Sequence, residues 1–239
     1  MTYKIIGVGT NAKTVKGDGS EFVTAITYHK PYKTAIDGIE RNLCAMAGVA
    51  QCDVACLFTA GRGQMNSVQQ ARYNKTVLFF KDRVLYMDLL NKDLTTFSRR
   101  TRKLGATPCY RPNGTSDYPW HKTGIMSLFP EIQFYDYTKV VKRAYEKLPA
   151  NYHLTLSYSG ANPDYAASVI KAVRDTGVNM AVVFRDKTLP KTWQGFDVIS
   201  GDNDDLRFLD PKGVVVGLYA KGKAKQDTSG FVVDAEVTK

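Results

Sequence analysis

The sequence lacks long apolar runs, and this absence limits where the protein can work. No apolar stretch reaches about 18 residues, the length expected of a membrane-spanning helix. The opening residues, MTYKIIGVGTNAKTVKG, contain no apolar stretch long enough for a signal peptide. We therefore expect a cytoplasmic protein with no membrane association.

Cysteine and histidine are scarce, and several catalytic motifs are absent. Four cysteines in 239 residues do not make a disulfide framework, so clustered cysteines in a reducing compartment point to ligands or catalysts. The three histidines are scattered. The sequence has no G-x-x-x-x-G-K-[ST] phosphate loop, no G-x-S-x-G elbow and no H-E-x-x-H helix, which argues against the enzyme classes that depend on them.

Positive charge is in excess, with 33 Lys and Arg against 23 Asp and Glu, a net charge of +10. This excess favours a polyanionic partner, such as a nucleotide, a nucleic acid or an acidic host protein. A lysine-rich solvated surface is the alternative. The basic residues concentrate in three runs, at 99–103, 139–147 and 221–225. The acidic residues concentrate in one run, at 197–210.

The pattern along the chain predicts an α/β protein. Helical spacing of apolar residues and helix stop signals predict helices at 67–81, 83–104, 124–129, 139–148 and 163–176. Short β-rich segments predict strands at 21–28, 106–111, 132–137, 153–159, 178–184, 196–200 and 214–219.

Strands that alternate with helices indicate a parallel sheet with helical crossovers. The runs VNMAVVF and VVVGLY are almost continuously apolar, as strands buried on both faces are. We expect one α/β domain over residues 1–239, with a partial or complete (β/α) barrel-like parallel sheet. A doubly wound open sheet is the second choice. Residues 1–20 are expected to form an irregular or hairpin-like arm, and residues 29–63 a long cysteine-bearing loop after the first strand.

Three of the four cysteines, Cys44, Cys52 and Cys56, lie in the segment NLCAMAGVAQCDVACLFTAGR. Soft thiolate ligands on a flexible loop suggest a metal site, with an iron–sulfur cluster as the first choice and zinc as the second. The spacing matches neither a zinc finger nor a bacterial ferredoxin. Buried structural cysteines without a metal are the alternative to any metal site, because free cysteine packs like a small hydrophobic residue. His29 is a candidate fourth ligand, and Cys109 either belongs to the core or completes the site.

Polar residues follow each predicted strand. Because the carboxyl ends of parallel strands lie at the same edge of a sheet, these residues are expected to lie close together. Asp117, Asp136 and Lys139 are the candidate catalytic groups, although an ion pair that fixes a turn or a helix cap explains them as well. The acidic run 202–205 could hold a hard cation, but a solvated turn is the favoured reading. The candidate substrate-binding residues are Arg111, Asn113, Thr115, Ser116, Ser157, Ser159 and Lys221.

Several strings resemble the gene product 88 family of small bacteriophage proteins. They are GTNAKTVKG, CLFTAGRG, RPNGTSD, FYDYTK, LTLSYSG and GDNDDLRFLDP followed by VVVGLYAKGKA, and they span nearly the whole chain. The resemblance implies a phage protein that works in the bacterial host cytoplasm. It implies little about chemistry, because the family has no settled activity.

A weaker resemblance concerns the layout of a strand, a three-cysteine loop and a run of βα units. This order is similar to that of radical S-adenosylmethionine enzymes, in which a partial barrel carries a four-iron cluster on three cysteines. The chain departs from the usual C-x₃-C-x₂-C spacing and has Ala55 where an aromatic residue is expected. The resemblance thus implies a 4Fe-4S cluster and, more remotely, bound S-adenosylmethionine.

Two functional hypotheses follow. In the first, the protein is an iron–sulfur enzyme, of radical type in its sharpest form, with a polar pocket at the strand ends for a nucleotide or nucleic acid. In the second, it is a nucleic-acid or host-protein binding module in which zinc or a cluster only stabilises the long loop. A metal-free α/β protein with buried cysteines is the third possibility.

Overall fold

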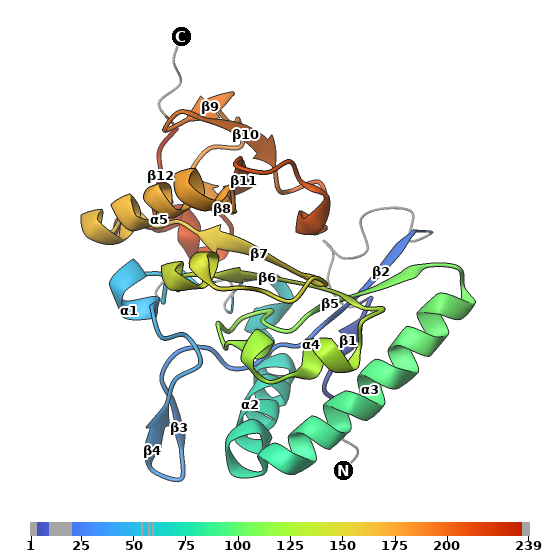
Figure 1. The fold of residues 1–239 in the computed structure, drawn as a ribbon. Coiled ribbons are helices and arrows are strands. Elements are labelled where there is room, and N and C mark those ends of the chain that lie inside the picture. The colour runs from blue at the N-terminus through green and yellow to red at the C-terminus, as the bar shows by residue number, and fades with distance from the viewer. Residues whose placement is uncertain (1–3, 10–20, 54, 57, 59, 236–239) are drawn as a thin grey trace. The chain divides into compact units, whose positions relative to one another are not determined.

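A computed structural model describes residues 4–9, 21–53, 55, 56, 58 and 60–235 (Figure 1). The predicted N-terminal arm therefore lies largely outside the described residues. The chain groups into two compact units, and each takes several segments of the sequence. Unit 1 comprises 1–44, 64–136 and 148–153, and unit 2 comprises 45–63, 137–147 and 154–239. The expectation of one domain remains a prediction.

Unit 1 contains strands in the order β1-β2-β5-β6. β2 and β5 are parallel, β5 and β6 are parallel, and the short β1 is antiparallel to β2. An antiparallel hairpin, β3–β4, interrupts the segment that we expected to be a plain loop. The strands are β1 (Gly7–Val8), β2 (Phe22–Ile26), β3 (Thr34–Ile36), β4 (Ile39–Arg41), β5 (Thr107–Arg111) and β6 (Gln133–Thr138), which continues into unit 2.

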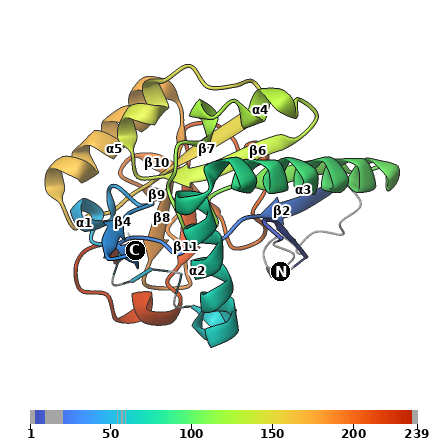
Figure 2. The same ribbon diagram turned by 90° about the horizontal axis from the view of Figure 1, so that it is seen from below.

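Two long helices, α2 (Asn66–Lys81) and α3 (Arg83–Lys103), pack on this part of the sheet. They meet at a corner, seen most clearly in Figure 2, where the Asp82 side chain caps α3 by accepting from the backbone N–H of Leu85. The buried face of α3 repeats every three or four residues, which gives it one apolar stripe. The shorter elements are η3 (Trp120–Lys122) and α4 (Ile125–Leu128).

Unit 2 contains strands in the order β7-β8-β11-β10-β9, with β12 also paired to β8. The pairs β7–β8, β8–β11, β10–β11 and β8–β12 are parallel, and β9 is antiparallel to β10. The strands are β7 (Tyr152–Ser157), which begins in unit 1, β8 (Asn179–Phe184), β9 (Thr192–Trp193), β10 (Phe196–Ser200), β11 (Val215–Tyr219) and β12 (Val232–Val233).

The two apolar strands predicted to be buried on both faces are β8 and β11, and both are buried. α5 (Pro163–Thr176) packs against them with a stripe of small and aliphatic residues. The remaining helical segments are short, namely α1 (Ala47–Ala50), η2 (Gly61–Gln64), η4 (Val141–Tyr145), η5 (Arg207–Leu209) and η6 (Gly222–Gln226).

The predicted fold class is confirmed in its coarse form, because the chain is α/β and most neighbouring strands are parallel. Closure of the strands into a barrel remains a prediction. One predicted helix, 139–148, was wrong in type, because the structure has only the 3₁₀ segment η4 there. The side chain of Arg143 is buried and donates to Thr138 Oγ1 at 2.9 Å, which holds this segment in a tight turn against the end of β6. No helix in the described part of the chain is long and apolar enough to cross a membrane.

Candidate functional site

The candidate site residues fall into two groups, one in each unit, and each group lies at the carboxyl ends of parallel strands. The group in unit 1 follows β5 and β6, and it includes Cys44. The group in unit 2 follows β6 and β7, and it includes Cys52 and Cys56, whereas Lys221, after β11, belongs to a separate network. Each unit therefore has candidate residues after its strands, and the site that they would form remains a prediction.

Asn113 organises the group in unit 1. Its Nδ2 donates to the carbonyl of Tyr118 at 2.9 Å and to Asp136 Oδ2 at 2.5 Å. Its Oδ1 accepts from Ser116 Oγ at 2.8 Å, from the Tyr118 N–H at 3.0 Å and from Trp120 Nε1 at 3.2 Å. Both Asn113 and Asp136 are buried. The amide thus holds the turn after β5 against the end of β6.

The same turn also fixes the start of the cysteine segment. The N–H of Gly114 donates to the carbonyl of Thr27, and a Cβ at this position would come within 2.6 Å of the Tyr28 ring, so the turn requires glycine. The N–H of Asp117 donates to the carbonyl of Leu43 at 2.7 Å. The Cys44 thiol donates to the carbonyl of Thr115 at 3.7 Å. Asp117 and Thr115 therefore contact the cysteine segment mainly through backbone atoms.

His29, the candidate fourth ligand, lies inside an aromatic cluster of unit 1. Its ring lies against Phe79, Tyr86 and Trp120, and its Nε2 is 2.9 Å from the Tyr86 hydroxyl. Burial, followed by the positive charge of Lys75 and then Arg83, lowers the pKa of His29 to about 3. The neutral ring is thus a packed core group, which supports a structural role.

Cys109 belongs to the core of unit 1. It lies in β5, its side chain is fully buried, and its thiol donates to the carbonyl of Thr107 at 3.8 Å. Burial raises the pKa of this thiol to about 12. Of the two alternatives left by the sequence, a core residue or a metal ligand, the structure favours the core residue.

Lys139 organises the group in unit 2. Its Nζ donates to Ser157 Oγ at 2.8 Å and lies 4.8 Å from the centre of the Phe231 ring. The Ser157 carbonyl also accepts from the hydroxyl of Tyr165, which ties the end of β7 to α5. The Ser159 hydroxyl donates to the carbonyl of Ala50 at 2.7 Å and so joins the strand end to the cysteine segment.

Cys52 and Cys56 are both partly exposed and in no disulfide, and Cys52 lies near enough to this lysine to be influenced by its charge. Burial raises the pKa of the Cys52 thiol, the charge of Lys139 opposes this rise, and the neighbouring Cys56 and Asp53 add to it. The backbone N–H of Phe58 points at the Cys56 sulfur at 3.5 Å. The net effect on Cys52 is a raised pKa, so its neutral thiol is favoured, and Lys139 only reduces this preference.

The acidic run and Lys221 form a separate network in unit 2. Buried Arg207 pairs with Asp204 at 2.9 Å and with Asp210 at 3.2 Å, and Lys221 pairs with Asp202 at 2.6 Å. These carboxylates already have protein cations beside them. The structure therefore favours an ion-paired turn over a site for a hard cation.

The complete three-cysteine site remains a prediction. Among the described residues, no three His, Cys, Asp or Glu side chains form a group arranged to hold a metal. Of the proposed acid–base pair, Asp136 accepts a hydrogen bond from Asn113 and Lys139 donates one to Ser157, and the acid–base role remains a prediction. Sequence reasoning also missed a hollow beside the end of α3, because its lining comes from segments far apart in the chain.

Comparison with known proteins gives one match. A family model described as Gene product 88 matches residues 5–235, nearly the whole chain. Searches of curated proteins and of solved structures each found no significant match.

Proposed function

Because this chain belongs to the bacteriophage gene product 88 family, we propose that it is a phage metalloprotein of the infected bacterial cytoplasm that binds an iron–sulfur cluster. The ligands in this proposal are Cys44, Cys52 and Cys56, and the cluster is of the 4Fe-4S type. The observation that carries the proposal is the pair of partly exposed cysteines, Cys52 and Cys56, which are in no disulfide, with the charge of Lys139 acting on Cys52.

The pair supplies what a thiolate site needs locally. The two cysteines are four residues apart in one short segment, and Cys56 contributes to the raised pKa of Cys52. Lys139 and the N–H of Phe58 compensate negative charge on the sulfurs. Hydrogen bonds to cluster sulfurs are one of the means by which proteins tune iron–sulfur sites. The third thiolate in the proposal is Cys44, which precedes this pair in the same segment.

A substrate pocket at the strand ends is the second part of the proposal. Lys139, Ser157 and Ser159 lie together in unit 2, next to the cysteine segment. An ammonium and hydroxyls that converge at strand ends suit a phosphate-bearing substrate, such as a nucleotide or a nucleic acid. In the radical form of the proposal, the cluster would also bind S-adenosylmethionine, and Asp117, Asp136 and Lys139 would be the catalytic residues.

The test is iron and sulfide analysis with an absorption spectrum on anaerobically purified protein. We expect about four irons and four sulfides per chain, and their loss in a Cys52→Ala variant. Cys109→Ala is the matched control, because this buried core thiol should leave the metal content unchanged. A protein without metal, or the same loss in both variants, would overturn the proposal.

Two further results would change the proposed function. One zinc per chain and no visible absorption would leave the alternative function, a zinc-stabilised module that binds nucleic acid or a host protein without catalysis. A cluster whose spectrum does not change when S-adenosylmethionine is added would remove the radical chemistry and leave the cluster protein.

A further inference from the structure

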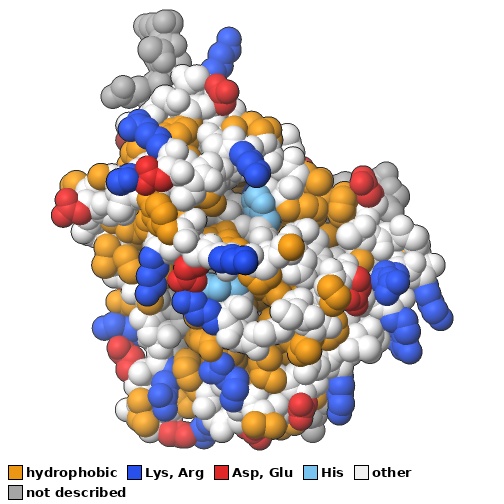
Figure 3. Space-filling view, in the orientation of Figure 1, with side chains coloured by type: hydrophobic (Ala, Val, Ile, Leu, Met, Phe, Trp, Pro, Cys, Tyr) orange, Lys and Arg blue, Asp and Glu red, His pale blue; other side chains and the backbone are white. Residues whose placement is uncertain are grey.

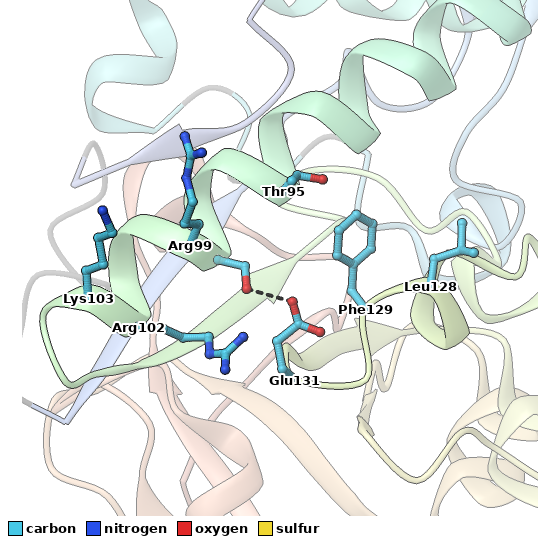
Figure 4. Close-up of a pocket in the computed structure, with 8 residues that line it drawn as sticks. Thr95, Arg99, Arg102, Lys103, Leu128, Phe129 and Glu131 are labelled. Atoms are coloured by element: carbon cyan, nitrogen blue, oxygen red, sulfur yellow. Dashed lines mark hydrogen bonds between the residues drawn. The ribbon is translucent and has the colours of Figure 1, made fainter.

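A hollow of about 540 Å³ lies on unit 1, between the C-terminal half of α3 and the segment after α4 (Figure 4). Its volume is in the range of small-molecule binding sites, roughly 300–1,000 Å³. From α3 come Thr95, Ser98, Arg99, Arg102 and Lys103, and from the other wall come Leu128, Phe129 and Glu131.

The charge of the hollow is predominantly positive. Arg99, Arg102 and Lys103 are spaced by three and four residues, so they share one face of the helix. All three are exposed, and within the described part of the chain none of them forms an ion pair. Figure 3 shows Lys and Arg side chains gathered over this end of α3. Unpaired guanidinium groups are suited to bidentate contacts with phosphate.

Compensation of the helix dipole explains only part of this arrangement. Cations in the last turn of a helix interact favourably with its negative end, and the last turn of α3 contains Arg100, Arg102 and Lys103. Arg100 nevertheless does not line the hollow. Arg99 lies before this last turn, so compensation of the helix dipole does not account for its positive charge.

The opposite wall differs in chemistry. Glu131 Oε1 accepts from the buried hydroxyl of Ser98 at 2.7 Å, which fixes the carboxylate at the edge of the cations. Leu128 is 64% exposed beside it. Phosphate alone would interact with the cations but not with a fixed carboxylate or an exposed apolar side chain. A ligand that joins phosphate to a hydroxyl- or amine-bearing group and to a flat apolar part would contact the cations, the carboxylate and the apolar side chain.

We infer that this hollow binds a nucleoside phosphate, either as a free nucleotide or as one unit of a single-stranded nucleic acid. The phosphate contacts Arg99, Arg102 and Lys103. Glu131 accepts a hydrogen bond from a sugar hydroxyl or a base amine, and the base lies against Leu128. This site is separate from the proposed cysteine site and does not depend on it.

The test is fluorescence anisotropy with a labelled single-stranded oligonucleotide at low salt, followed by competition with unlabelled mononucleotide. Arg102→Ala should weaken binding about 10-fold and lower the salt dependence of the affinity. Arg100→Ala removes the same charge from the same exposed helix end, and we expect a change below about 2-fold. Equal losses in the two variants would show that only diffuse charge attracts the probe and would overturn the inference.

Two variants of Glu131 give an independent readout, because Glu131→Gln removes the charge and keeps an acceptor, whereas Glu131→Leu removes both. If the carboxylate only repels anions, both variants bind the oligonucleotide more tightly and equally, which contradicts the inference. If Glu131 accepts a hydrogen bond from sugar or base, Glu131→Leu binds nucleotides more weakly than Glu131→Gln does, and both variants bind inorganic phosphate more tightly. Competition by mononucleotide identifies a free nucleotide as the source, and failure of this competition identifies the strand. No binding of either probe would overturn the proposal.

Repeating the oligonucleotide measurement on Cys52→Ala separates this inference from the proposed function. Unchanged affinity in that variant places the nucleotide away from the cysteine site, whatever its metal content proves to be. Affinity lost with Cys52→Ala and retained with Arg102→Ala would assign the nucleic acid to the strand-end pocket and overturn the inference.

Discussion

At the scale of single residues, the polar side chains at the strand ends were predictable, but their hydrogen-bond partners were not. Asn113 was expected to bind substrate, yet its donors and acceptor are used by Tyr118, Asp136, Ser116 and Trp120. These partners come from loop packing, which residue type and strand position do not specify. The bonding favours a positioning role for Asn113 in the turn after β5.

The neutral state of His29 predicts a loss of stability in mild acid. The pKa of His29 is lowered from 6.5 to about 3 in the folded protein, so between these values the unfolded chain binds the proton more readily. The stabilisation is complete above pH 6.5 and is lost as the pH falls towards 3. Between pH 7 and pH 5 this residue alone should reduce the free energy of unfolding by about 2 kcal/mol. Urea unfolding at several pH values measures it.

A His29→Gln variant provides the comparison, because it retains a polar side chain without an imidazole. Its unfolding free energy should vary less between pH 7 and pH 5 than that of the natural protein. Asp210, whose pKa is raised to about 6, chiefly by burial, has the opposite effect on the pH dependence of stability. Its contribution is the same in both proteins, so it cancels when their unfolding free energies are subtracted. An imidazole titration near pH 6.5, observed for His29 by NMR, would contradict the argument.

At the scale of elements, the sequence predicted the long helices and the buried strands well. α2, α3 and α5 begin or end within about two residues of the predicted bounds, because apolar spacing, Asn162 and Gly177 mark them. Apolar residue type alone did not identify the buried positions, since Val84 of α3 is 74% exposed. The β3–β4 hairpin was missed, because three-residue strands give too short a pattern for alternation to be read.

The N-terminus of α5 predicts a measurable capping effect. The Asn162 side chain accepts from the N–H of Tyr165 at 2.9 Å, and the Tyr165 hydroxyl in turn donates to the carbonyl of Ser157. Asn162→Ala should lower the free energy of unfolding by about 1 kcal/mol. Asn162→Asp should retain the cap and lose little. Thermal or urea unfolding of the three proteins tests this, and equal stabilities would show that the cap contributes nothing.

At the scale of the whole molecule, the net charge was known from composition, whereas the division into two units was not. The strand pattern predicted one continuous α/β domain, but compactness depends on contacts between residues distant in sequence, which no local pattern records. The chain passes from unit 1 to unit 2 within β6, after Asp136, and again within β7, after His153. Neither unit is one continuous stretch of sequence.

This interleaving leads us to predict a single cooperative unfolding transition. Strands β6 and β7 each supply residues to both units, so unfolding either unit disrupts strands that the other needs. The two tryptophans report on the units separately. Trp120 lies in the aromatic cluster of unit 1, and Trp193 packs on Tyr158 and Phe184 in unit 2.

The measurement uses two variants, Trp120→Phe and Trp193→Phe, each with one tryptophan left. In each variant, urea unfolding followed by fluorescence and by far-ultraviolet circular dichroism should give the same midpoint. Comparing the two probes within one protein removes the effect of the substitution on stability, which we expect to be larger for buried Trp120. Separate midpoints in either variant would mean that the units unfold independently, and the prediction of one domain over residues 1–239 would then be wrong.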